Sequence, residues 1–336
     1  MGFVLDTTHM NKFLQNLKDE YLFFAPKRFV GGGTFSDTDC IRYGQIHSIE
    51  EVVFDAKSQY SFKEAILPIS QTLFYFTEEE ATEAAMPQKK ALIFVRNCDL
   101  HAVKRLDGIY LNNGFPDHYY TKLREAVKFV VMGCESSFEN CFCVSMGTSK
   151  SDDYALSIDK QGADYAIDCK DYSFANSFKG GIPADVEPKF VSSNEVTVAI
   201  PQDLDNRVAN SKMWDEYDTR CIACGRCNFV CPTCTCFTTQ DIFYSDNGKV
   251  GERRRVWASC MVDGFTDMAG GHQFRVKRGQ RMRYRVLHKV LNYKKKHGEN
   301  MCVGCGRCDD ICPEYISFSN AINKLESAVK EVAGNE

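Results

Sequence analysis

The sequence predicts two domains of different class: a mixed α/β (α+β) domain over residues 1–205, followed by an α-helical domain over residues 206–336. Short apolar runs with strand composition lie in the first part, whereas helical periodicity dominates the second. Two near-identical cysteine runs lie in the second part and organise it. A chain of 336 residues is long enough to build two separate cores.

The first domain opens with a predicted helix over Met10–Glu20, where Phe13, Leu14 and Leu17 fall on one side. The glycines of Gly31–Gly33 mark a loop. Four strands are predicted from their β-branched and aromatic content: Gln71–Phe76, Ala91–Val95, Lys128–Met132 and Val196–Ile200. Pro201 ends the last strand, and a polar stretch leads to the second domain.

The second domain is predicted to hold two helices besides its cysteine runs. Arg275–Lys296 contains no proline, and its apolar residues recur at helical spacing. Ser319–Ala333 places its apolar residues on one stripe, which predicts a packing helix. A long insertion separates the two cysteine runs, and it includes the basic segment of residues 249–300.

Each cysteine run has the spacing C-x2-C-x2-C-x3-C-P, the first over Cys221–Pro232 and the second over Cys302–Pro313. This spacing is typical of a four-iron cubane cluster. Three closely spaced thiolates cap one face of the core and do not easily reach the fourth iron, so the fourth cysteine of each run ligates the other cluster. The first 4Fe-4S cluster is assigned to Cys221, Cys224, Cys227 and Cys312. The second is assigned to Cys302, Cys305, Cys308 and Cys231.

A pair of zinc sites is the alternative, because paired C-x2-C spacings also suit zinc. Zinc patterns place two ligands, a long gap and two more ligands, whereas here the full cubane run occurs twice. Gly225, Gly304 and Gly306 let backbone approach a cluster closely, and Pro232 and Pro313 set the turn after the last ligand. The second domain is therefore predicted to be a ferredoxin-like dicluster domain.

Four cysteines of the first domain could hold a third 4Fe-4S cluster. Cys98 and Cys134 follow two predicted strands, and residues just past strand ends are where α/β sheets place functional groups. Cys141 and Cys143 add two thiols nearby. The alternative is four inert core thiols, since cysteine is among the most buried residue types. The other cysteines are predicted to lie near the clusters (Cys234, Cys236 and Cys260) or to be ordinary thiols (Cys40 and Cys169).

Composition excludes several classes of protein. A hydrophobic content of 44% and a charged content of 26% are ordinary for a soluble globular protein. The N-terminus has no signal peptide, and no stretch approaches the ~20 apolar residues of a membrane span. A cytoplasmic location is expected, and clustered cysteines there more often bind metal than form disulfides. Open thiols and exposed clusters also indicate an anaerobic setting. The chain has no G-x-G-x-x-G after a strand and no P-loop, hence no nucleotide site of its own.

Residues 249–300 form a basic segment with 14 Lys or Arg against 4 Asp or Glu, a net charge of +10 that leaves −14 for the rest. It is interpreted in three ways: as a solvated helical face, as counter-charge for anionic clusters, or as a docking surface for an acidic partner. Nucleic-acid binding ranks below these, because no recognised nucleic-acid module surrounds the segment.

Five segments carry a resemblance to known proteins: Arg96–Ala102, Cys141–Thr148, Cys221–Phe237, Ala269–Arg275 and the second cysteine run. In these segments the chain resembles the iron–sulfur A subunits of anaerobic sulfite reductases, and it is also similar to β subunits of cytoplasmic sulfhydrogenases. Asn97 departs from the proline expected at its position. The resemblance implies a non-catalytic electron-transfer subunit that connects an FAD-containing, NADH-oxidising flavin subunit with a sirohaem subunit that reduces sulfite to sulfide. Neither a membrane nor a nucleic acid is an expected partner.

Two rival functions stay open at this point. An electron-transfer β subunit of a cytoplasmic hydrogenase or sulfhydrogenase would carry the same clusters and serve a different terminal enzyme. An iron–sulfur regulator would use the basic segment to bind nucleic acid, with salt-dependent affinity. No catalytic residue is predicted in this chain if it is the electron-transfer subunit of either a sulfite reductase or a hydrogenase.

Overall fold

The computed structural model describes residues 1–34 and 37–334, and the chain divides into two compact units built from discontinuous segments. The first unit comprises Met1–Phe138, Ser149–Ser192 and Thr239–Val256. The second comprises Glu139–Thr148, Ser193–Thr238 and Trp257–Glu336. Glu139–Thr148 therefore belongs to the second unit although it interrupts the first in sequence, and Thr239–Val256 belongs to the first although it interrupts the second. The predicted domains, with their boundary at residue 205, are each continuous in sequence. That boundary stays a prediction.

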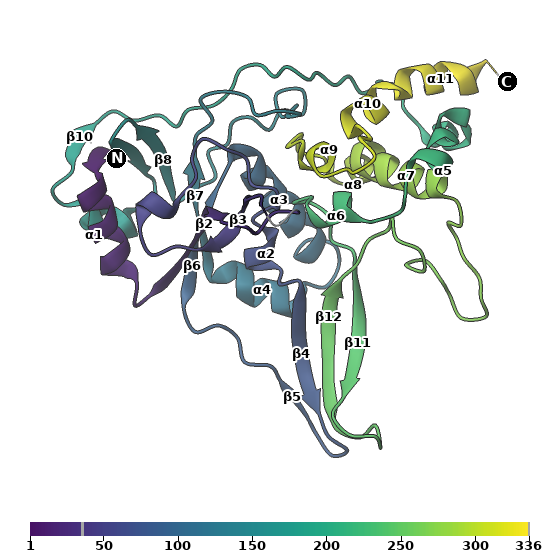
Figure 1. The fold of residues 1–336 in the computed structure, drawn as a ribbon, viewed down its shortest axis with the longest axis horizontal. Helices are drawn as coiled ribbons and strands as arrows, with labels where there is room; N and C mark the ends of the chain where they lie inside the picture. The colour runs from purple at the N-terminus through teal and green to yellow at the C-terminus, as the bar shows by residue number, and fades with distance from the viewer. Residues whose placement is uncertain (35–36, 335–336) are drawn as a thin grey trace. The chain divides into compact units, whose positions relative to one another are not determined.

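The first unit is built around an eight-stranded sheet of order β10-β1-β9-β8-β7-β6-β2-β3 (Figure 1). Its strands are β1 (Gly2–Asp6), β2 (Tyr21–Phe29), β3 (Cys40–Gln45), β6 (Lys90–Val95), β7 (Val127–Met132), β8 (Leu156–Gln161), β9 (Asp164–Cys169) and β10 (Ile182–Ala184). The central strands β2, β6, β7 and β8 pair in parallel, and the outer strands pair antiparallel. The carboxyl ends of β6 and β7 therefore meet at the same edge of the sheet.

Helices cover both faces of this sheet because the central strands are apolar on both sides. Met10, Phe13 and Leu14 of α1 (Thr7–Leu17) pack into one core together with Leu92 and Phe94 of β6. Helix α3 (Asn97–Tyr110) packs against β7, and the short helices α2 (Lys63–Ile66) and α4 (His118–Glu125) contact one another. The first unit is therefore an α/β fold.

A second sheet of the first unit has the order β11-β12-β4-β5 and is visible in Figure 1 as a separate group of strands. Its strands are β4 (Ser70–Phe76), β5 (Ala81–Glu83), β11 (Phe237–Phe243) and β12 (Gly251–Trp257). The last two come from the insertion between the cysteine runs, which the sequence did not predict to form strands. Arg255 of β12 lies 2.8 Å from Asp117 and 2.8 Å from Gln71, which ties the strand to its unit.

The second unit is helical. Its helices are α5 (Glu216–Arg220), α6 (Arg226–Phe229), α7 (Arg278–Leu287), α8 (Tyr293–His297), α9 (Arg307–Asp310), α10 (Phe318–Asn323) and α11 (Leu325–Ala333). A π-helical stretch over His288–Asn292 joins α7 to α8. Its core gathers Trp214, Val286, Val290, Ile322 and Leu325 with their neighbours. The predicted fold class, mixed α/β followed by a helical dicluster domain, is confirmed.

Most of the predicted elements are confirmed, with shifted ends. The first predicted helix is α1, three of the predicted strands are β4, β6 and β7, and the Arg275–Lys296 helix is α7, the π stretch and α8. The helix over Ser319–Ala333 is instead two helices, α10 and α11, separated at Lys324. Of the described elements, none lies between β10 and Asn206.

The strand predicted over Val196–Ile200 is wrong. Its apolar side chains pack onto the core of the second unit, but side chains satisfy its backbone in place of a neighbouring strand. Ser145 Oγ accepts from the amide of Val198 at 3.1 Å, and Asn323 accepts from the amide of Ala199 at 3.0 Å. Apolar alternation alone therefore did not distinguish a strand from an extended segment.

No helix among residues 1–34 and 37–334 has the length and apolar character needed to cross a membrane.

Candidate metal centre

The two cysteine runs fold alike. In each, a glycine in the left-handed region precedes a one-turn helix, Gly225 (φ +76°) before α6 and Gly306 (φ +70°) before α9. The third cysteine of each run, Cys227 or Cys308, lies in that helix. A side chain at Gly225 or Gly306 would be strained in this conformation and would also meet neighbouring atoms. The repeated spacing therefore produces a repeated local structure that turns the thiols toward one another.

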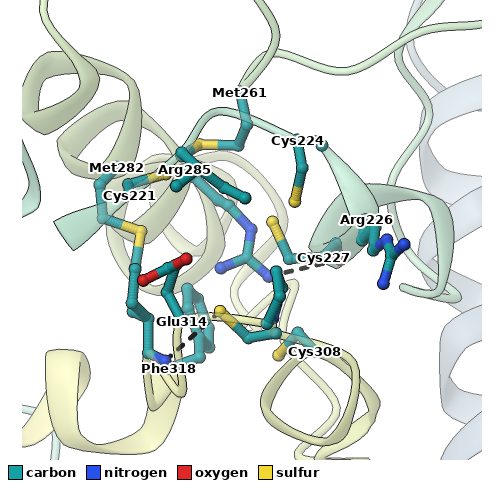
Figure 2. Close-up of a pocket in the computed structure, with 15 residues that line it drawn as sticks. Cys221, Cys224, Arg226, Cys227, Met261, Met282, Arg285, Cys308, Glu314 and Phe318 are labelled. Carbon is teal, nitrogen blue, oxygen red and sulfur yellow. Dashed lines mark hydrogen bonds between the residues drawn. The ribbon is translucent and has the colours of Figure 1, made fainter.

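One cavity of the second unit, here called the outer cavity, is bordered by Cys221, Cys224, Cys227 and Cys312 and has an empty volume of about 480 Å³. Met261, Met282 and Phe318 form an apolar wall around it (Figure 2). Cys224 is exposed, and Ile222 beside it is 50% exposed. The outer cavity is therefore open to solvent at one of its thiols.

A second cavity, here called the inner cavity, is bordered by Cys231, Cys302, Cys305 and Cys308 and has an empty volume of about 330 Å³. Each residue that lines it is buried or half-buried, including Phe142, Val303 and Phe318. Cys308 and Arg285 border both cavities. The structure thus brings each predicted crossover set to one cavity, and the assignment of ligands to individual clusters stays a prediction.

The thiols are spread around these cavities. Within the described part of the chain, no three His, Cys, Asp or Glu side chains converge closely enough to hold a single metal ion. A cubane core is larger than an ion, so its four sulfur ligands lie further apart than those of zinc. Each cavity is bordered by at least four thiols, the number of ligands that a cubane needs.

Two buried cations lie between the thiols, and the sequence-based prediction did not single them out. Arg285, 3% exposed, donates from Nε to Asn228 Oδ1 at 3.1 Å and from Nη2 to the Cys227 carbonyl at 3.5 Å, and its guanidinium lies 4.2 Å from the centre of the Phe318 ring. Figure 2 shows this guanidinium among the labelled sulfur atoms, whereas that of Arg226 points away. Lys289, also 3% exposed, donates to Thr233 Oγ1 at 2.6 Å and lies 3.5 Å from Cys231 Sγ.

Neither cation has a carboxylate partner in the part of the chain that the structure describes. A buried, unpaired charge is costly, and proteins tolerate it where an opposite charge compensates. A cubane with four thiolate ligands carries about two negative charges. The cavities therefore fit anionic iron–sulfur clusters, with Arg285 and Lys289 as their built-in counter-charge.

The pKa values of the thiols follow from burial and from these cations. Burial raises the pKa of Cys227 to about 11 and that of Cys302 to about 12. A hydrogen bond with the Cys234 thiol, opposed by burial and assisted by the Lys289 ammonium, holds the pKa of Cys231 well below its ordinary value. Burial opposes the charge of Lys289, but Cys231, Cys234 and Cys302 together hold its pKa above the ordinary value. Cys231 is thereby biased toward the thiolate that metals bind.

The loop containing Cys141 and Cys143 packs directly on the second cysteine run. Phe142, 1% exposed, donates its amide hydrogen bond to the Gly304 carbonyl at 2.8 Å. Thr148 Oγ1 donates to the Val303 carbonyl at 2.7 Å. A Cβ at Gly304 would lie 2.6 Å from the Phe142 carbonyl carbon, so glycine permits this close approach. Both thiols of the loop are buried, and Phe142 lines the inner cavity.

The other two cysteines of the predicted third cluster lie in the first unit. Cys98 is the second residue of α3, just after β6, and Cys134 follows the adjacent parallel strand β7. Cys134 also borders a cavity with Arg96 and Asp159, in which burial raises the pKa of Asp159. The four cysteines are thus shared between two units, and the third cluster stays a prediction.

The remaining cysteines include one that contacts the metal centre through Asn228. Cys260 is buried and accepts a hydrogen bond from Asn228 Nδ2 at 3.0 Å, and the Oδ1 of the same amide receives Arg285. Cys234 is buried and Cys236 half-buried, both in the second unit. Cys40 and Cys169 are buried in the first unit, where burial raises the pKa of Cys169 to about 11.

Paired thiol cavities with buried counter-charges are typical of an iron–sulfur protein. The family model of the 4Fe-4S dicluster domain matches residues 220–316, a segment that includes both cysteine runs. The chain therefore carries 4Fe-4S clusters in a dicluster domain, as its sequence predicted.

The chain is similar to the sulfhydrogenase 2 subunit beta of Pyrococcus furiosus. The two proteins are 28% identical over 345 residues, which cover 97% of this chain and 98% of that subunit. The similarity thus extends through both units, well beyond the cysteine runs. No solved structure matches the chain.

Proposed function

We propose that this chain is the electron-transfer β-type subunit of a multi-subunit hydrogenase complex of the sulfhydrogenase kind. The observation that carries the proposal is the full-length similarity to a sulfhydrogenase β subunit, combined with two thiol cavities that share a buried arginine. The proposed partners are a flavin subunit and a hydrogenase subunit. The function of the chain is to hold its clusters at fixed positions and to exchange single electrons with those partners.

The proposed ligand sets are the crossover sets, Cys221, Cys224, Cys227 and Cys312 around the outer cavity and Cys302, Cys305, Cys308 and Cys231 around the inner cavity. Their support is that each set borders one cavity although its fourth member belongs to the other run. Cys308 and Arg285 border both cavities, so the two proposed cluster sites are adjacent. Adjacent sites favour electron exchange between the clusters.

The outer cavity is the proposed point of exchange with a partner. Its support is exposure: Cys224 and Ile222 lie at the surface, and Tyr315 nearby in the chain is 88% exposed. The loop of Cys141 and Cys143 packs on the opposite, inner site and extends the proposed route toward the predicted third cluster. In this route an electron passes from the surface through the outer site and then the inner site toward that loop, or along the same sites in the reverse direction.

A sirohaem sulfite reductase is the second candidate for the terminal enzyme. It is favoured by the segments Cys141–Thr148 and Ala269–Arg275, which resemble those of sulfite reductase A subunits. The similarity to a sulfhydrogenase subunit over 97% of the chain supports the hydrogenase partner better. Both candidates leave the role of this chain the same.

The test is anaerobic purification of the tagged chain from its native host, followed by spectroscopy of whatever complex it forms. With a hydrogenase partner, hydrogen gas reduces the clusters of the complex, and sulfite does not reoxidise them. The isolated chain should respond to neither hydrogen nor NADH and should carry at least about eight irons. Reoxidation by sulfite would transfer the assignment to the sirohaem partner. A complex whose clusters respond to no redox partner would contradict the electron-transfer proposal itself.

A further inference from the structure

Lys289 connects the two cysteine runs through both its backbone and its side chain. Its carbonyl accepts hydrogen bonds from the amides of Met301 at 2.9 Å and Cys302 at 3.3 Å, where the second run begins. Its ammonium lies 3.5 Å from the Sγ of Cys231, at the end of the first run. The residue lies in the π-helical stretch, a local irregularity of a kind often found at functional sites. A positive charge is therefore fixed beside the inner thiols.

The outer thiols lack such a contact. The Sγ atoms of Cys221 and Cys312 accept from the backbone amides of Ala223 at 3.4 Å and Ile316 at 3.3 Å. Across the described residues, no lysine or arginine side chain donates a hydrogen bond to an outer thiol. Arg285 borders both cavities, so its charge acts on both sites. The contact of Lys289 with Cys231 therefore distinguishes the inner site from the outer one.

Burial of the inner site makes its reduction harder, whereas the charge of Lys289 makes it easier. Reduction adds negative charge, and a dry environment disfavours added charge. The inner cavity has no exposed lining residue, whereas the outer cavity includes exposed Cys224. Burial alone would make the inner site the harder one to reduce. A fixed ammonium in the interior is little screened by salt, so its attraction for added negative charge persists there.

We propose that Lys289 is a positioning residue that sets the order of reduction, so that the site of Cys231, Cys302, Cys305 and Cys308 accepts the first electron despite its burial. An electron received at the outer site then moves inward, away from the exposed surface. The transfer moves one electron, with no proton and no bond exchanged. The inference rests on the proposed ligand sets and is independent of which partner enzyme is present.

The test is a potentiometric titration of the iron-loaded full chain with dithionite, followed by electron paramagnetic resonance. Cys224→Ser and Cys305→Ser assign the signals, because each perturbs one site. In the unsubstituted protein, the signal that Cys305→Ser alters should be reduced first. Lys289→Met should lower the midpoint of this signal by at least 59 mV, a tenfold change in a one-electron equilibrium constant. The order of reduction should then invert.

Two further variants separate charge from packing. Lys289→Arg keeps the charge and should return the midpoint toward that of the unsubstituted protein. Lys294→Met removes an exposed lysine of α8 and should shift neither signal. Reduction of the outer site first in the unsubstituted protein would overturn the proposal, and so would equal shifts of both signals in Lys289→Met. If Lys289→Met failed to retain iron, the order in the unsubstituted protein and the Arg variant would still decide. A wrong partner assignment would leave these potentials unchanged.

Discussion

Gly304→Ala tests the contact between the loop 139–148 and the second cysteine run. The first run has Ala223 at the equivalent position, with φ +57°, so an alanine is compatible with the cluster-binding turn itself. Gly304 has a similar φ of +67°, but the backbone of Phe142 and Cys143 packs against it. A Cβ there would lie 2.6 Å from the Phe142 carbonyl oxygen and 2.7 Å from the Cys143 amide nitrogen. Backbone atoms cannot rotate away, so the loop must move.

The expected loss has two parts. The left-handed conformation costs alanine about 1–2 kcal/mol. Displacing the loop also breaks the hydrogen bond from the Phe142 amide to the Gly304 carbonyl, which contributes about 0.5–1.5 kcal/mol. It also exposes part of the Phe142 side chain, whose full burial contributes about 1.5–3 kcal/mol. The matched control is Gly298→Ala, at φ +78° with no atom within 4 Å of the added Cβ, which carries the first part alone. Gly304→Ala should therefore lose about 2–4 kcal/mol more than the control.

Anaerobic urea unfolding of the iron-loaded chain, followed by the visible absorption of its clusters, measures this difference. Hydrogen exchange across residues 139–148 should accelerate in Gly304→Ala and stay unchanged in Gly298→Ala. Equal losses of stability in the two variants, together with unchanged exchange in this loop, would refute the close packing of the loop on the second run.

Three further predictions concern the clusters and their surroundings. Cys312→Ser should damage the cluster held by Cys221, Cys224 and Cys227, and a spectrum in which only the other cluster is lost would contradict the crossover. Burial, with repulsion from Lys289 second, lowers the pKa of His288 to about 4, so only the unfolded chain binds the proton between about pH 6.5 and 4. Stability should fall by at most about 1.4 kcal/mol per pH unit as pH drops through this window, and urea midpoints at two pH values should show a smaller fall in His288→Gln. After iron removal, Lys289→Met should unfold at a lower urea concentration than the unsubstituted apoprotein, because the buried Cys231 thiolate loses the ammonium that compensates its charge. An unchanged or higher midpoint would contradict this pairing.

The cysteine runs could be predicted from the sequence because the chemistry of a cubane restricts ligand spacing to a short pattern. The sequence also predicted β6 and β7, whose continuous apolar runs are buried on both faces of a parallel sheet. Spacing does not show long-range packing. The hydrogen bond of Phe142 with Gly304 joins residues far apart in the chain, and the strand β12 pairs with β4 across a similarly long separation.

The helical periodicity of the sequence could have predicted the buried cations Arg285 and Lys289. Arg281, Arg285 and Lys289 are spaced by four residues, which places them on one side of a helix. Apolar Met282, Val286 and Val290 are interleaved at the same period, so a cationic stripe borders an apolar one. Charged residues on a solvated helix face ordinarily lie opposite its apolar stripe. Cations beside that stripe predict buried charges, and buried cations require an anion.

The basic segment of residues 249–300 therefore does not act as one surface, and the three interpretations of its charge apply to different members. Arg281, Arg285 and Lys289 are buried, and only Arg281 is paired with a carboxylate, that of Asp263. The other two serve as counter-charge for the thiol cavities. Lys294, Lys295 and Lys296 are exposed in α8, on a surface that an acidic partner could approach. The net charge of a segment is thus a poor guide to its function, because cations close together in a helical sequence can lie on different faces, some buried and others in solvent. In the proposed order of reduction, buried Lys289 favours the inner site, whereas the exposed lysines would act on the rate at which a partner associates.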